Sequence, residues 1–519
     1  MKKRQPVLLS LLVVSCYVPM TWASHYIAPL STHDFSSWRS NTGDWEIAGD
    51  VTLAPDNASK LQAKPGKGVI VNGPNGRTSH LVSKTSFGDV RVHIEFCVPK
   101  GSNSGVYFMG RYEIQVLDSW EQGEAYAGHQ AGGIYQRWDN NRKPPGFEGH
   151  APLVNVSRPP GQWQSFDIVF RAPRFDAKGE KTSPAAFVKV IHNGHVVHNY
   201  VELTGPTRAS LYHDETATGP FMIQGDHGAV AYRNMWVQPI DLEICELENP
   251  FFTFESGIAP AGDRSPKAQV SLLKQLGYDG LEHMGCKDVP AILDELDKQA
   301  LRLFTIYTPI QVDPALPPYD PELKNILPLL SGRQVILWMH TPHSRNTSLT
   351  QAQAYQRIIE ISRDLSDLVR PYGVRIAFYP HTSLWVDKIG QAVDLVKQVD
   401  RKNVGAVFNL CHRLKVEGAG HWQKSLKQAM PHLFAVSLNG ADQGDTQAMG
   451  WNRLIQPLNQ GTFDIYPLIK TLNDLNYSGP MGLQCYNIKA KPEDHLATSK
   501  RAWQILAQRL EADKLLNQD

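Results

Sequence analysis

Cysteine is scarce in this chain, and the few cysteines are not spaced as pairs. The sequence has 6 cysteines in 519 residues, and no two of them form a C-x-x-C arrangement. Such a scattered set is not a disulfide framework and offers no cysteine zinc site. We therefore expect the cysteines that follow Cys16 to be free, buried thiols.

An excess of charge of either sign is also missing. Lys plus Arg amounts to 52 and Asp plus Glu to 51, which leaves a formal net charge of +1. Nothing in this balance indicates a nucleic acid partner or an anionic membrane surface. We expect a neutral partner instead. A small carbohydrate suits the 12 tryptophans, because flat aromatic faces stack against sugar rings.

Long apolar runs are confined to the N-terminus. Basic residues at positions 2–4 precede the run PVLLSLLVVSCYVPM, which is too short by about five residues to be a permanent transmembrane helix. This pattern predicts an export signal over residues 1–23 with cleavage after Ala23, and hence a periplasmic or extracellular protein. An alternative interpretation makes Cys16, in VVSC, the lipidated first residue of the mature chain.

Residues 24–240 show a short alternating pattern with almost no helical periodicity. Segments such as DVRVHIEFCVP and QSFDIVFRAP alternate apolar with polar residues and are separated by Gly, Asn and Pro. Asn193 and Gly194 lie between two β-rich segments and predict a hairpin turn. The pattern predicts an all-β jelly-roll sandwich of antiparallel strands.

After a linker over residues 241–250, the pattern changes. Eight short apolar runs, from FFTFE at residue 251 to MGLQCYN at residue 481, alternate with stretches whose apolar residues are three and four positions apart. Eight strand–helix units predict an α/β fold, a (β/α)₈ TIM barrel, over residues 251–519. The chain is therefore expected to be multidomain, with a β-sandwich followed by a TIM barrel.

One expected strand of the first domain carries polar side chains along one face. In RYEIQVLDSW, residues 111–120, Arg111, Glu113 and Gln115 leave the strand on the side opposite to the apolar residues. Taken alone, a cation, a carboxylate and an amide on one face favour a local polar cluster over a ligand site. Such a cluster could be an ion pair of Arg111 with Glu113 beside a hydrogen-bonded Gln115.

The first domain resembles a known family over nearly its whole length. The phrases PKGSNSGVYFMGRYEIQVLDSW, NVSRPPGQWQSFDIVFRAPRFDAKG and GDHGAVAYRNMWVQP follow one another as in the 3-keto-disaccharide hydrolase domain. The resemblance implies a concanavalin-like jelly roll. It also implies cleavage of disaccharides that are oxidised at carbon 3 of one sugar, with the polar face around Glu113 as the sugar site.

The polar strand is also similar to the catalytic E-x-D-x-x-E strand of laminarinase-like hydrolases, in which a bulge returns the third residue to the shared face. Here the residues are Glu113, Gln115 and Asp118, which departs from the two matched carboxyls of a double displacement. A ketone at carbon 3 acidifies the neighbouring C2–H bond and allows an elimination instead. That route needs one base and one group that stabilises the enolate oxygen.

These considerations assign roles in the first domain. Glu113 or His227 would be the base, and Arg111, Arg158 or a bound cation would stabilise the enolate oxygen. His227, in GDHGAV, either reaches the site or is an incidental turn residue, and Arg158 could simply brace its loop. The predicted catalytic residues are Glu113, His227 and Asp118, and the predicted substrate-binding residues are Arg111, Gln115, Tyr135 and Arg158.

In the second domain, polar residues follow the expected strands where a TIM barrel carries its function. The motifs LGYDGLE, FNLCHRL, SLNGAD and NYSGPMGLQCYN resemble the xylose-isomerase-like barrels of the sugar phosphate isomerase/epimerase superfamily. The resemblance implies a divalent metal held by Glu, Asp, His and Glu from successive strand ends, which would polarise sugar oxygens.

Two of the expected carboxylates are amides here, Asn409 and Gln484, and a neutral amide is a weaker ligand for a hard ion. The remaining groups could still hold Zn, Mn or Co, or they could bind a sugar through hydrogen bonds alone. His340 and His343, in MHTPH, are left out of the metal site, because two such histidines on a loop are more often solvated. The predicted ligands are Glu282, His381, Asn409, His412 and Gln484, and Tyr307 and Asn439 are predicted to bind substrate.

Together the two halves predict an exported carbohydrate-active enzyme, a glycoside hydrolase or lyase. Its first domain would cleave 3-keto-glycosides, and its barrel would act on the same sugar or on the product. In an alternative, the jelly roll is a non-catalytic sugar-binding module that serves an isomerase, epimerase or lyase barrel. In a third, the barrel is a degenerate scaffold.

Overall fold

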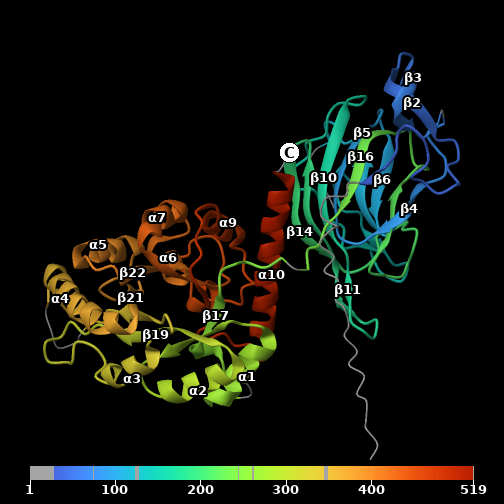
Figure 1. The fold of residues 1–519 in the computed structure, drawn as a ribbon. Coiled ribbons are helices and arrows are strands. Elements are labelled where there is room, and N and C mark those ends of the chain that lie inside the picture. The colour runs from blue at the N-terminus through green and yellow to red at the C-terminus, as the bar shows by residue number, and fades with distance from the viewer. Residues whose placement is uncertain are drawn as a thin grey trace, which may run out of the picture. The chain divides into compact units, whose positions relative to one another are not determined.

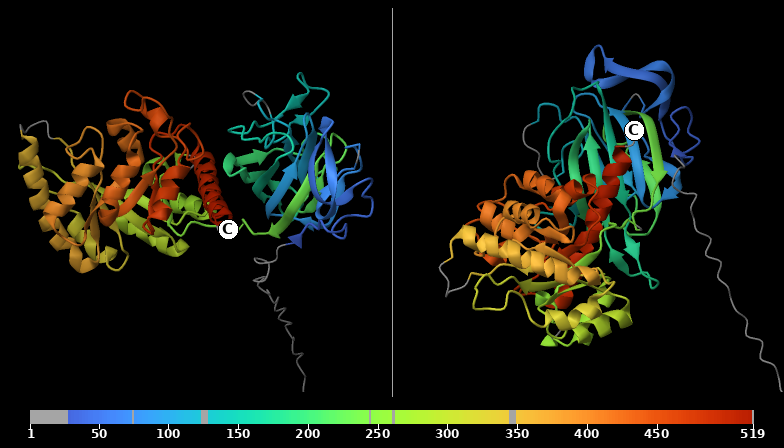
Figure 2. Two further views of the ribbon diagram at one scale, coloured as in Figure 1. Left: turned by 90° about the horizontal axis from the view of Figure 1, so that it is seen from above. Right: turned by 60° about the vertical axis from the view of Figure 1, so that its left-hand side comes forward.

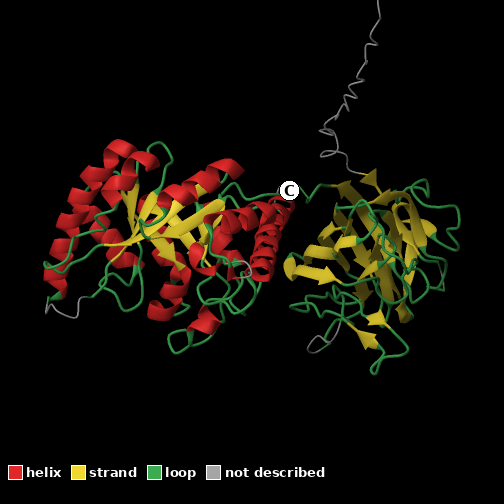
Figure 3. Ribbon diagram, turned by 90° about the horizontal axis from the view of Figure 1, so that it is seen from below, coloured by secondary structure: helices red, strands yellow, loops and turns green. Residues whose placement is uncertain are grey.

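The computed structural model describes residues 28–73, 75–122, 128–243, 245–259, 262–343 and 349–517. The chain divides into two compact units, one built mainly from residues before 245 and the other from Cys245–Leu510. Strands and loops form the first unit, whereas helices surround the strands of the second (Figures 1 and 3). The predicted export signal and the alternative lipid site at Cys16 lie outside the described residues. A membrane-spanning helix is not found among the described ones.

The first unit contains two antiparallel sheets, which confirms the predicted β-sandwich. Its main strands are β1 (Ala28–Pro29), β2 (Glu46–Ala54), β3 (Asn57–Val71), β4 (Leu81–Phe87), β5 (Val90–Cys97), β6 (Asn103–Phe108), β7 (Tyr112–Leu117), β10 (Trp163–Arg171), β13 (Ala185–His192), β14 (His195–Leu203), β15 (Gly219–Ile223) and β16 (Ala231–Pro239). The larger sheet has the order β14-β13-β10-β5-β16-β3-β2, with β1 paired to β16, and the smaller sheet has the order β4-β15-β6-β7. Short pairs are formed by β8 (Arg137–Trp138) with β9 (Gly146–Phe147) and by β11 (Arg174–Phe175) with β12 (Lys181–Ser183).

The predicted hairpin at Asn193 and Gly194 joins β13 to β14. Both residues have left-handed backbones, with φ of +50° and +82°, as a two-residue turn between right-twisted strands requires. His192 and His195 pair directly across the turn. The choice of Asn-Gly therefore determines where this hairpin turns.

Aromatic side chains from both sheets fill the core of the sandwich. Phe108 from the smaller sheet contacts Phe170 and Phe187 from the larger one, with ring centroids 5.0 and 5.2 Å apart. Such pairs contribute roughly 0.5–1.5 kcal/mol each beyond the burial of apolar area. Because side chains alternate along a strand, the opposite face of the smaller sheet is left for polar residues.

The second unit is a closed barrel of parallel strands with helices around it, seen in two further views in Figure 2. Its strands are β17 (Phe251–Phe254), β18 (Gly280–Met284), β19 (Arg302–Pro309), β20 (Ile336–His340), β21 (Arg375–Phe378), β22 (Val404–Asn409), β23 (Leu433–Leu438) and β24 (Met481–Leu483). Its helices are α1 (Pro266–Leu276), α2 (Val289–Gln299), α3 (Leu323–Leu330), α4 (Gln351–Val369), α5 (Ile389–Val399), α6 (Leu410–Glu417), α7 (Trp422–Ala429), α8 (Trp451–Leu454), α9 (Tyr466–Asp474) and α10 (Pro492–Leu516). Single turns of 3₁₀ helix are η1 (Glu255–Gly257), η3 (Arg370–Tyr372) and η4 (Met430–His432). Every apolar run predicted as a barrel strand is confirmed.

Helix boundaries follow local sequence signals. The hydroxyl of Ser265 accepts a hydrogen bond from the backbone N–H of Ala268 at the start of α1, and the helix ends at Gly277 with a left-handed φ of 75°. Thr350 and Gln353 form a reciprocal capping box at the start of α4. These residues satisfy backbone groups that a helix end leaves unpaired.

The structure tests the expectation that the scattered cysteines form no disulfides. All those after Cys16 are free thiols, and Cys97, Cys286, Cys411 and Cys485 are buried. The expectation that these cysteines form no disulfide is confirmed, whereas the expected burial is wrong for Cys245, which is partly exposed.

Aromatic packing inside the barrel leads to a stability prediction. Trp338 is fully buried, and its ring centroid lies 5.8 Å from that of Phe252 and 5.2 Å from that of Phe254. We expect Trp338→Ala to cost about 3–5 kcal/mol of unfolding free energy, because the side chain leaves a cavity. Denaturant unfolding of the barrel measures this change. Leu329→Ala, at a side chain 44% exposed, is the control and should shift the free energy by less than about 0.5 kcal/mol; equal effects of the two variants would contradict the prediction.

Candidate functional site

Two predicted site residues of the first unit, Glu113 and Gln115, lie on β7, at the edge of the smaller sheet, and Arg111 directly precedes this strand. The pairing of β6 with β7 is regular from Asn103 opposite Leu117 to Phe108 opposite Tyr112. Glu113 and its polar neighbours are buried: Arg111 is 3%, Glu113 2% and Gln115 4% exposed. They therefore do not point into bulk solvent.

The carboxyl of Glu113 is held from the neighbouring strand. Tyr107, directly opposite on β6, donates a hydrogen bond from its hydroxyl to Glu113 Oε2 at 2.6 Å. Gly105 leaves room for the carboxyl, since a Cβ there would lie only 2.2 Å from Glu113 Oε1. Burial raises the pKa of Glu113 to about 8; the Tyr107 hydrogen bond opposes this rise, and the charge of Asp226 adds to it. A carboxyl with such a pKa suits proton transfer near neutral pH.

The loop after β15 lies beside this carboxyl. Nδ1 of His227 is 2.5 Å from Oδ1 of Asp226, and Nδ1 of His80 is 3.9 Å from the same oxygen. The charge of Asp226 acts on the pKa of both Glu113 and Tyr107. His227 thus pairs with Asp226 through a side chain that is 48% exposed, and its catalytic role stays a prediction.

Three other predicted residues have their polar atoms engaged in loops. Arg111 donates to the backbone oxygen of Asp214 at 2.5 Å and to its carboxylate at 2.7 Å. Asp118 follows the last residue of β7 and accepts a hydrogen bond from the backbone N–H of Gly101 at 2.9 Å. Because the β6–β7 pairing has no bulge, nothing returns Asp118 to the face of Glu113. Arg158 is exposed and donates to the backbone oxygen of Trp163, the first residue of β10, at 2.8 Å. These contacts brace loops, so the roles of all three residues stay predictions.

A small cavity of about 160 Å³ lies next to the edge of β7. Tyr135 and Thr207 line it, and Thr207 Oγ1 accepts the backbone N–H of Glu113 at 3.2 Å. The amide nitrogen of Gln115 instead donates to Asn103 Oδ1 at 2.8 Å. Tyr135 therefore borders a hollow close to Glu113, whereas Gln115 is tied to the adjacent strand.

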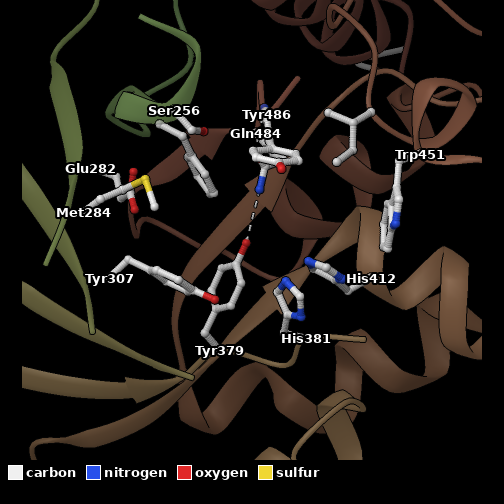
Figure 4. A pocket seen from close by; sticks show the side chains of 12 residues that line it. Ser256, Glu282, Met284, Tyr307, Tyr379, His381, His412, Trp451, Gln484 and Tyr486 are labelled. Carbon is white, nitrogen blue, oxygen red and sulfur yellow. Dashed lines mark hydrogen bonds between the residues drawn. The ribbon is translucent and has the colours of Figure 1, made fainter. Parts of the chain in front are cut away.

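The carboxyl ends of the barrel strands enclose a larger cavity of about 460 Å³ (Figure 4). Small-molecule sites typically measure roughly 300–1,000 Å³. It is lined by Phe254, Ser256, Glu282, Met284, Tyr307, Tyr379, His381, His412, Trp451, Ile455, Gln484 and Tyr486. Five of the predicted barrel residues line this cavity: Glu282, Tyr307, His381, His412 and Gln484. The other two, Asn409 and Asn439, do not.

Glu282, on β18, is like Glu113 a buried carboxyl with a raised pKa. It is 2% exposed, and its Oε2 accepts the backbone N–H of Glu255 at 3.1 Å. Burial raises the pKa of Glu282 to about 8, the bond from the Glu255 N–H opposes this rise, and the negative charge of Glu255 adds to it. Burial thus favours the protonated form of Glu282, which can donate a proton.

His381 and His412 lie side by side, with ring centroids 3.8 Å apart, and both contact Thr382. Nδ1 of His381 is 2.9 Å from the backbone oxygen of Thr382. Nδ1 of His412 is 3.2 Å from the backbone nitrogen of Thr382 and 3.0 Å from its hydroxyl. Burial lowers the pKa of both histidines, and His381 lowers that of His412 further. Both imidazoles are therefore neutral at neutral pH.

The amides at the strand ends are engaged in internal hydrogen bonds. Asn409 donates to the backbone oxygen of Pro380 at 3.2 Å, and its Oδ1 accepts from Cys411 Sγ at 3.3 Å. Gln484 accepts the backbone N–H of Tyr486 at 2.9 Å, and its nitrogen is 3.4 Å from the hydroxyl of Tyr379. Asn439 donates to the backbone oxygen of Leu454 at 2.6 Å and so ties β23 to α8.

These donors do not fit the Glu, Asp, His, Glu metal set that the barrel family implies. Across the part of the chain that the structure describes, no three His, Cys, Asp or Glu side chains come together as ligands of one ion. A structural or catalytic zinc site requires at least three protein ligands. The side chains present favour direct contacts to a ligand over coordination of an ion.

Several residues of both sites carry no clear signal in the sequence. Tyr107 and Gly105 become recognisable only once the register of β6 against β7 is known. Tyr379 directly follows the strand RIAF and could have been found as a strand-end residue. Trp451 is the first residue of the short helix α8, which follows β23. No local sequence pattern indicates that it belongs to the site.

The fold and the two sites define a class, an antiparallel β-sandwich followed by a TIM barrel with a polar cavity at its strand ends. Residues 30–238 match the family model of the 3-keto-alpha-glucoside-1,2-lyase-like domain. Residues 329–506 match that of the xylose isomerase-like TIM barrel. The chain is thus a 3-keto-α-glucoside-1,2-lyase-like domain fused to a xylose isomerase-like TIM barrel, which confirms both resemblances.

Individual relatives are similar over part of the chain. Inosose isomerase of Bacillus licheniformis is 28% identical over 148 residues, which are 27% of this chain and 52% of that protein. The chain therefore spans about half the length of the curated relatives it matches. Two solved structures resemble the chain with a TM-score of 0.40 and cover 49% of it. They are 3-keto-D-glucoside 4-epimerase from E. coli (15% identical, 98% of that chain) and the IOLI protein with a binding zinc atom (20% identical, 96% of that chain).

The raised pKa of Glu113 predicts how stability depends on pH. In the folded chain the carboxyl keeps its proton up to about pH 8, whereas in the unfolded chain it loses the proton near its ordinary value of about 4.3. Between these values the folded state binds more protons, so stability falls as pH rises. Glu113→Gln removes this loss. We expect its melting temperature to exceed that of the wild type by a few degrees at pH 8.5 and by less at pH 5; a constant difference would contradict the prediction.

Proposed function

We propose that this chain is an exported enzyme that acts on oxidised carbohydrates. In this proposal the first unit cleaves the glycosidic bond of 3-keto-glycosides, and the barrel acts on the same sugar or on the product. One observation supports it most directly: a buried carboxyl, Glu113, with a pKa of about 8, is held by Tyr107 on the polar face of β7. The match to the lyase-like domain model supports the same reaction class.

The proposed reaction is an elimination followed by hydration. The carboxylate of Glu113 takes the proton from C2, and the C–H electrons flow toward the ketone at C3 to form an enolate. When the C1–O bond breaks, these electrons form the C1=C2 double bond, and the leaving oxygen takes the bonding pair and a proton. Water then adds across the double bond, with hydroxyl to C1 and a proton to C2. No external oxidant or reductant is needed.

Each participating group has one task. Glu113 must be ionised when substrate is bound, so the rate should rise with pH toward the pKa of this carboxyl. Tyr107 fixes the carboxyl and, through its hydrogen bond, favours the ionised form. His227, paired with Asp226, would supply the proton to the leaving oxygen. The hollow that Tyr135 lines would take part of the sugar.

A second candidate locates the chemistry in the barrel and makes the first unit a sugar-binding module. The observation that favours it is the cavity of about 460 Å³, which brings the acid Glu282 together with His381 and His412. Such a site could move protons on a bound keto sugar and so isomerise or epimerise it.

Paired variants of the full chain separate the two candidates. The assay is release of glucose from 3-keto-trehalose by the wild type, by Glu113→Gln and by Glu282→Gln. Loss of release in Glu113→Gln with release retained in Glu282→Gln supports cleavage by the first unit. The reverse pattern would assign cleavage to the barrel and overturn the proposal.

A further inference from the structure

The hydrogen bonds of His412 define which of its nitrogens carries the proton. Nδ1 faces the backbone N–H of Thr382 at 3.2 Å, and a backbone N–H can only donate. Nδ1 is therefore the acceptor, and in the neutral ring the proton is on Nε2. His412 has no lone pair left for a metal ion, and towards the cavity it offers a hydrogen-bond donor.

In the contact of His381 with Thr382, the histidine is the hydrogen-bond donor rather than the acceptor. Its Nδ1 faces the backbone oxygen of Thr382 at 2.9 Å, and a carbonyl oxygen can only accept. Nδ1 therefore carries the proton, and Nε2 keeps its lone pair. Thr382 thus holds two adjacent histidines in opposite tautomers, one donor and one acceptor. The two rings lie next to each other in Figure 4.

The remaining predicted ligands leave too few donors for an ion. Asn409 is turned into internal hydrogen bonds and does not line the cavity. The oxygen of Gln484 accepts the backbone N–H of Tyr486. The predicted ligands therefore offer an ion only the Nε2 lone pair of His381 and the buried carboxyl of Glu282. A zinc site needs at least three protein ligands.

The walls of the cavity suit a sugar ring instead. Trp451 lies edge-on to His412, with ring centroids 5.1 Å apart, and Tyr486 is 58% exposed at the cavity. An aromatic face packs against the C–H face of a pyranose, while the hydroxyls at the ring edge need partners that both donate and accept. A hydroxyl can accept from His412 and a neighbouring hydroxyl can donate to His381.

We infer that the barrel binds a neutral keto sugar directly, through the complementary donor and acceptor nitrogens of His412 and His381, and that no resident metal ion takes part. The sugar class rests on the proposed function, whereas the tautomers and the missing metal rest on the barrel alone. The inference departs from the metal-dependent chemistry that the sequence resemblance implies for this barrel.

The test uses the full chain, with two replacements of one residue. His412→Gln keeps an amide N–H close to the position of Nε2, and His412→Asn, shorter by one carbon, does not reach it. The probe is 3-keto-glucose, and binding is measured by titration calorimetry with and without EDTA. We expect EDTA to leave the dissociation constant of the wild type unchanged. We expect His412→Gln to bind within about threefold of the wild type and His412→Asn to bind about tenfold more weakly, the scale of one neutral hydrogen bond.

Metal content gives a second test, which needs no sugar. We expect the wild type, purified without chelator, to hold only substoichiometric zinc, manganese or cobalt by elemental analysis. One retained equivalent that His412→Gln loses would overturn the inference, and so would sugar binding that EDTA abolishes. Failure of the proposed cleavage would instead appear in glucose release and would leave metal content and sugar binding unchanged.

Discussion

Glu113→Gln is expected to lower the rate of glucose release from 3-keto-trehalose by roughly 10²–10⁴-fold, the usual contribution of a general base. The replacement keeps the shape of the side chain and can still accept the hydrogen bond from Tyr107. It removes only the ability to take up a proton. The KM of the variant should therefore change little while kcat falls, and steady-state kinetics of the full chain measures both.

The control for this prediction is Glu95→Gln. Glu95 lies on β5 of the larger sheet and forms an ion pair with Arg233, with Nε and Oε2 2.6 Å apart. The replacement is the same, a carboxyl by a carboxamide, but Glu95 is not part of the site, so the rate should stay at the wild-type level. Equal rates for wild type and Glu113→Gln, with both proteins folded, would remove Glu113 from the reaction.

Gly105→Ala is expected to reduce the same rate by about 10²-fold without touching a titratable group, because displacing a reacting group by about 1 Å costs this much. The new Cβ would lie 2.2 Å from Glu113 Oε1 and 2.9 Å from Cε2 of Tyr107, closer than any real Cβ contact. The carboxyl must therefore move away from its place on β7. Such overpacking should also lower the unfolding free energy by about 1–3 kcal/mol.

Gly390→Ala is the matched control, because a Cβ at Gly390 meets no other atom within 4 Å. Kinetics at a temperature well below both melting transitions separates lost positioning from unfolding. If Gly105→Ala retains the full rate, the tight fit between β6 and the carboxyl has no part in catalysis.

The sequence predicts most of the fold because both units obey simple periodicities. Alternation over residues 24–240 indicates the sandwich, and the apolar runs from 251 onward correspond to the barrel strands. The polar face of β7 could be predicted for the same reason, since alternation alone puts Arg111, Glu113 and Gln115 together. Burial on that face could not be predicted, because it depends on loops that pack against the strand from elsewhere in the chain.

The details of the two sites depend on contacts between distant residues. Tyr107 reaches Glu113 because the turn at Met109 and Gly110, both with positive φ, fixes the register of β6 against β7. The bulge expected near Asp118 is absent because the β6–β7 ladder runs regularly to Leu117. No periodicity in the sequence encodes either feature.

For the two histidines of the barrel, the sequence predicts their positions but not their hydrogen bonds. The sequence indicates His381 and His412 as polar strand-end residues, and it indicates the two amides that weaken a metal site. Only the structure shows that the backbone of Thr382 contacts both rings, once through its oxygen and once through its nitrogen. That local arrangement determines whether these rings can hold an ion or a sugar.

The fate of the hydrogen on C2 tests the central claim most directly. A 3-keto-glycoside that carries deuterium at C2 is cleaved by the full chain in ordinary water, and the released keto sugar is analysed by mass spectrometry at early times beside the unreacted substrate. Elimination by Glu113 predicts that deuterium is lost from the product as fast as the glycosidic bond breaks, while the remaining substrate keeps it. Product that retains its deuterium at C2 would contradict the account, because the bond would then have broken without removal of that hydrogen.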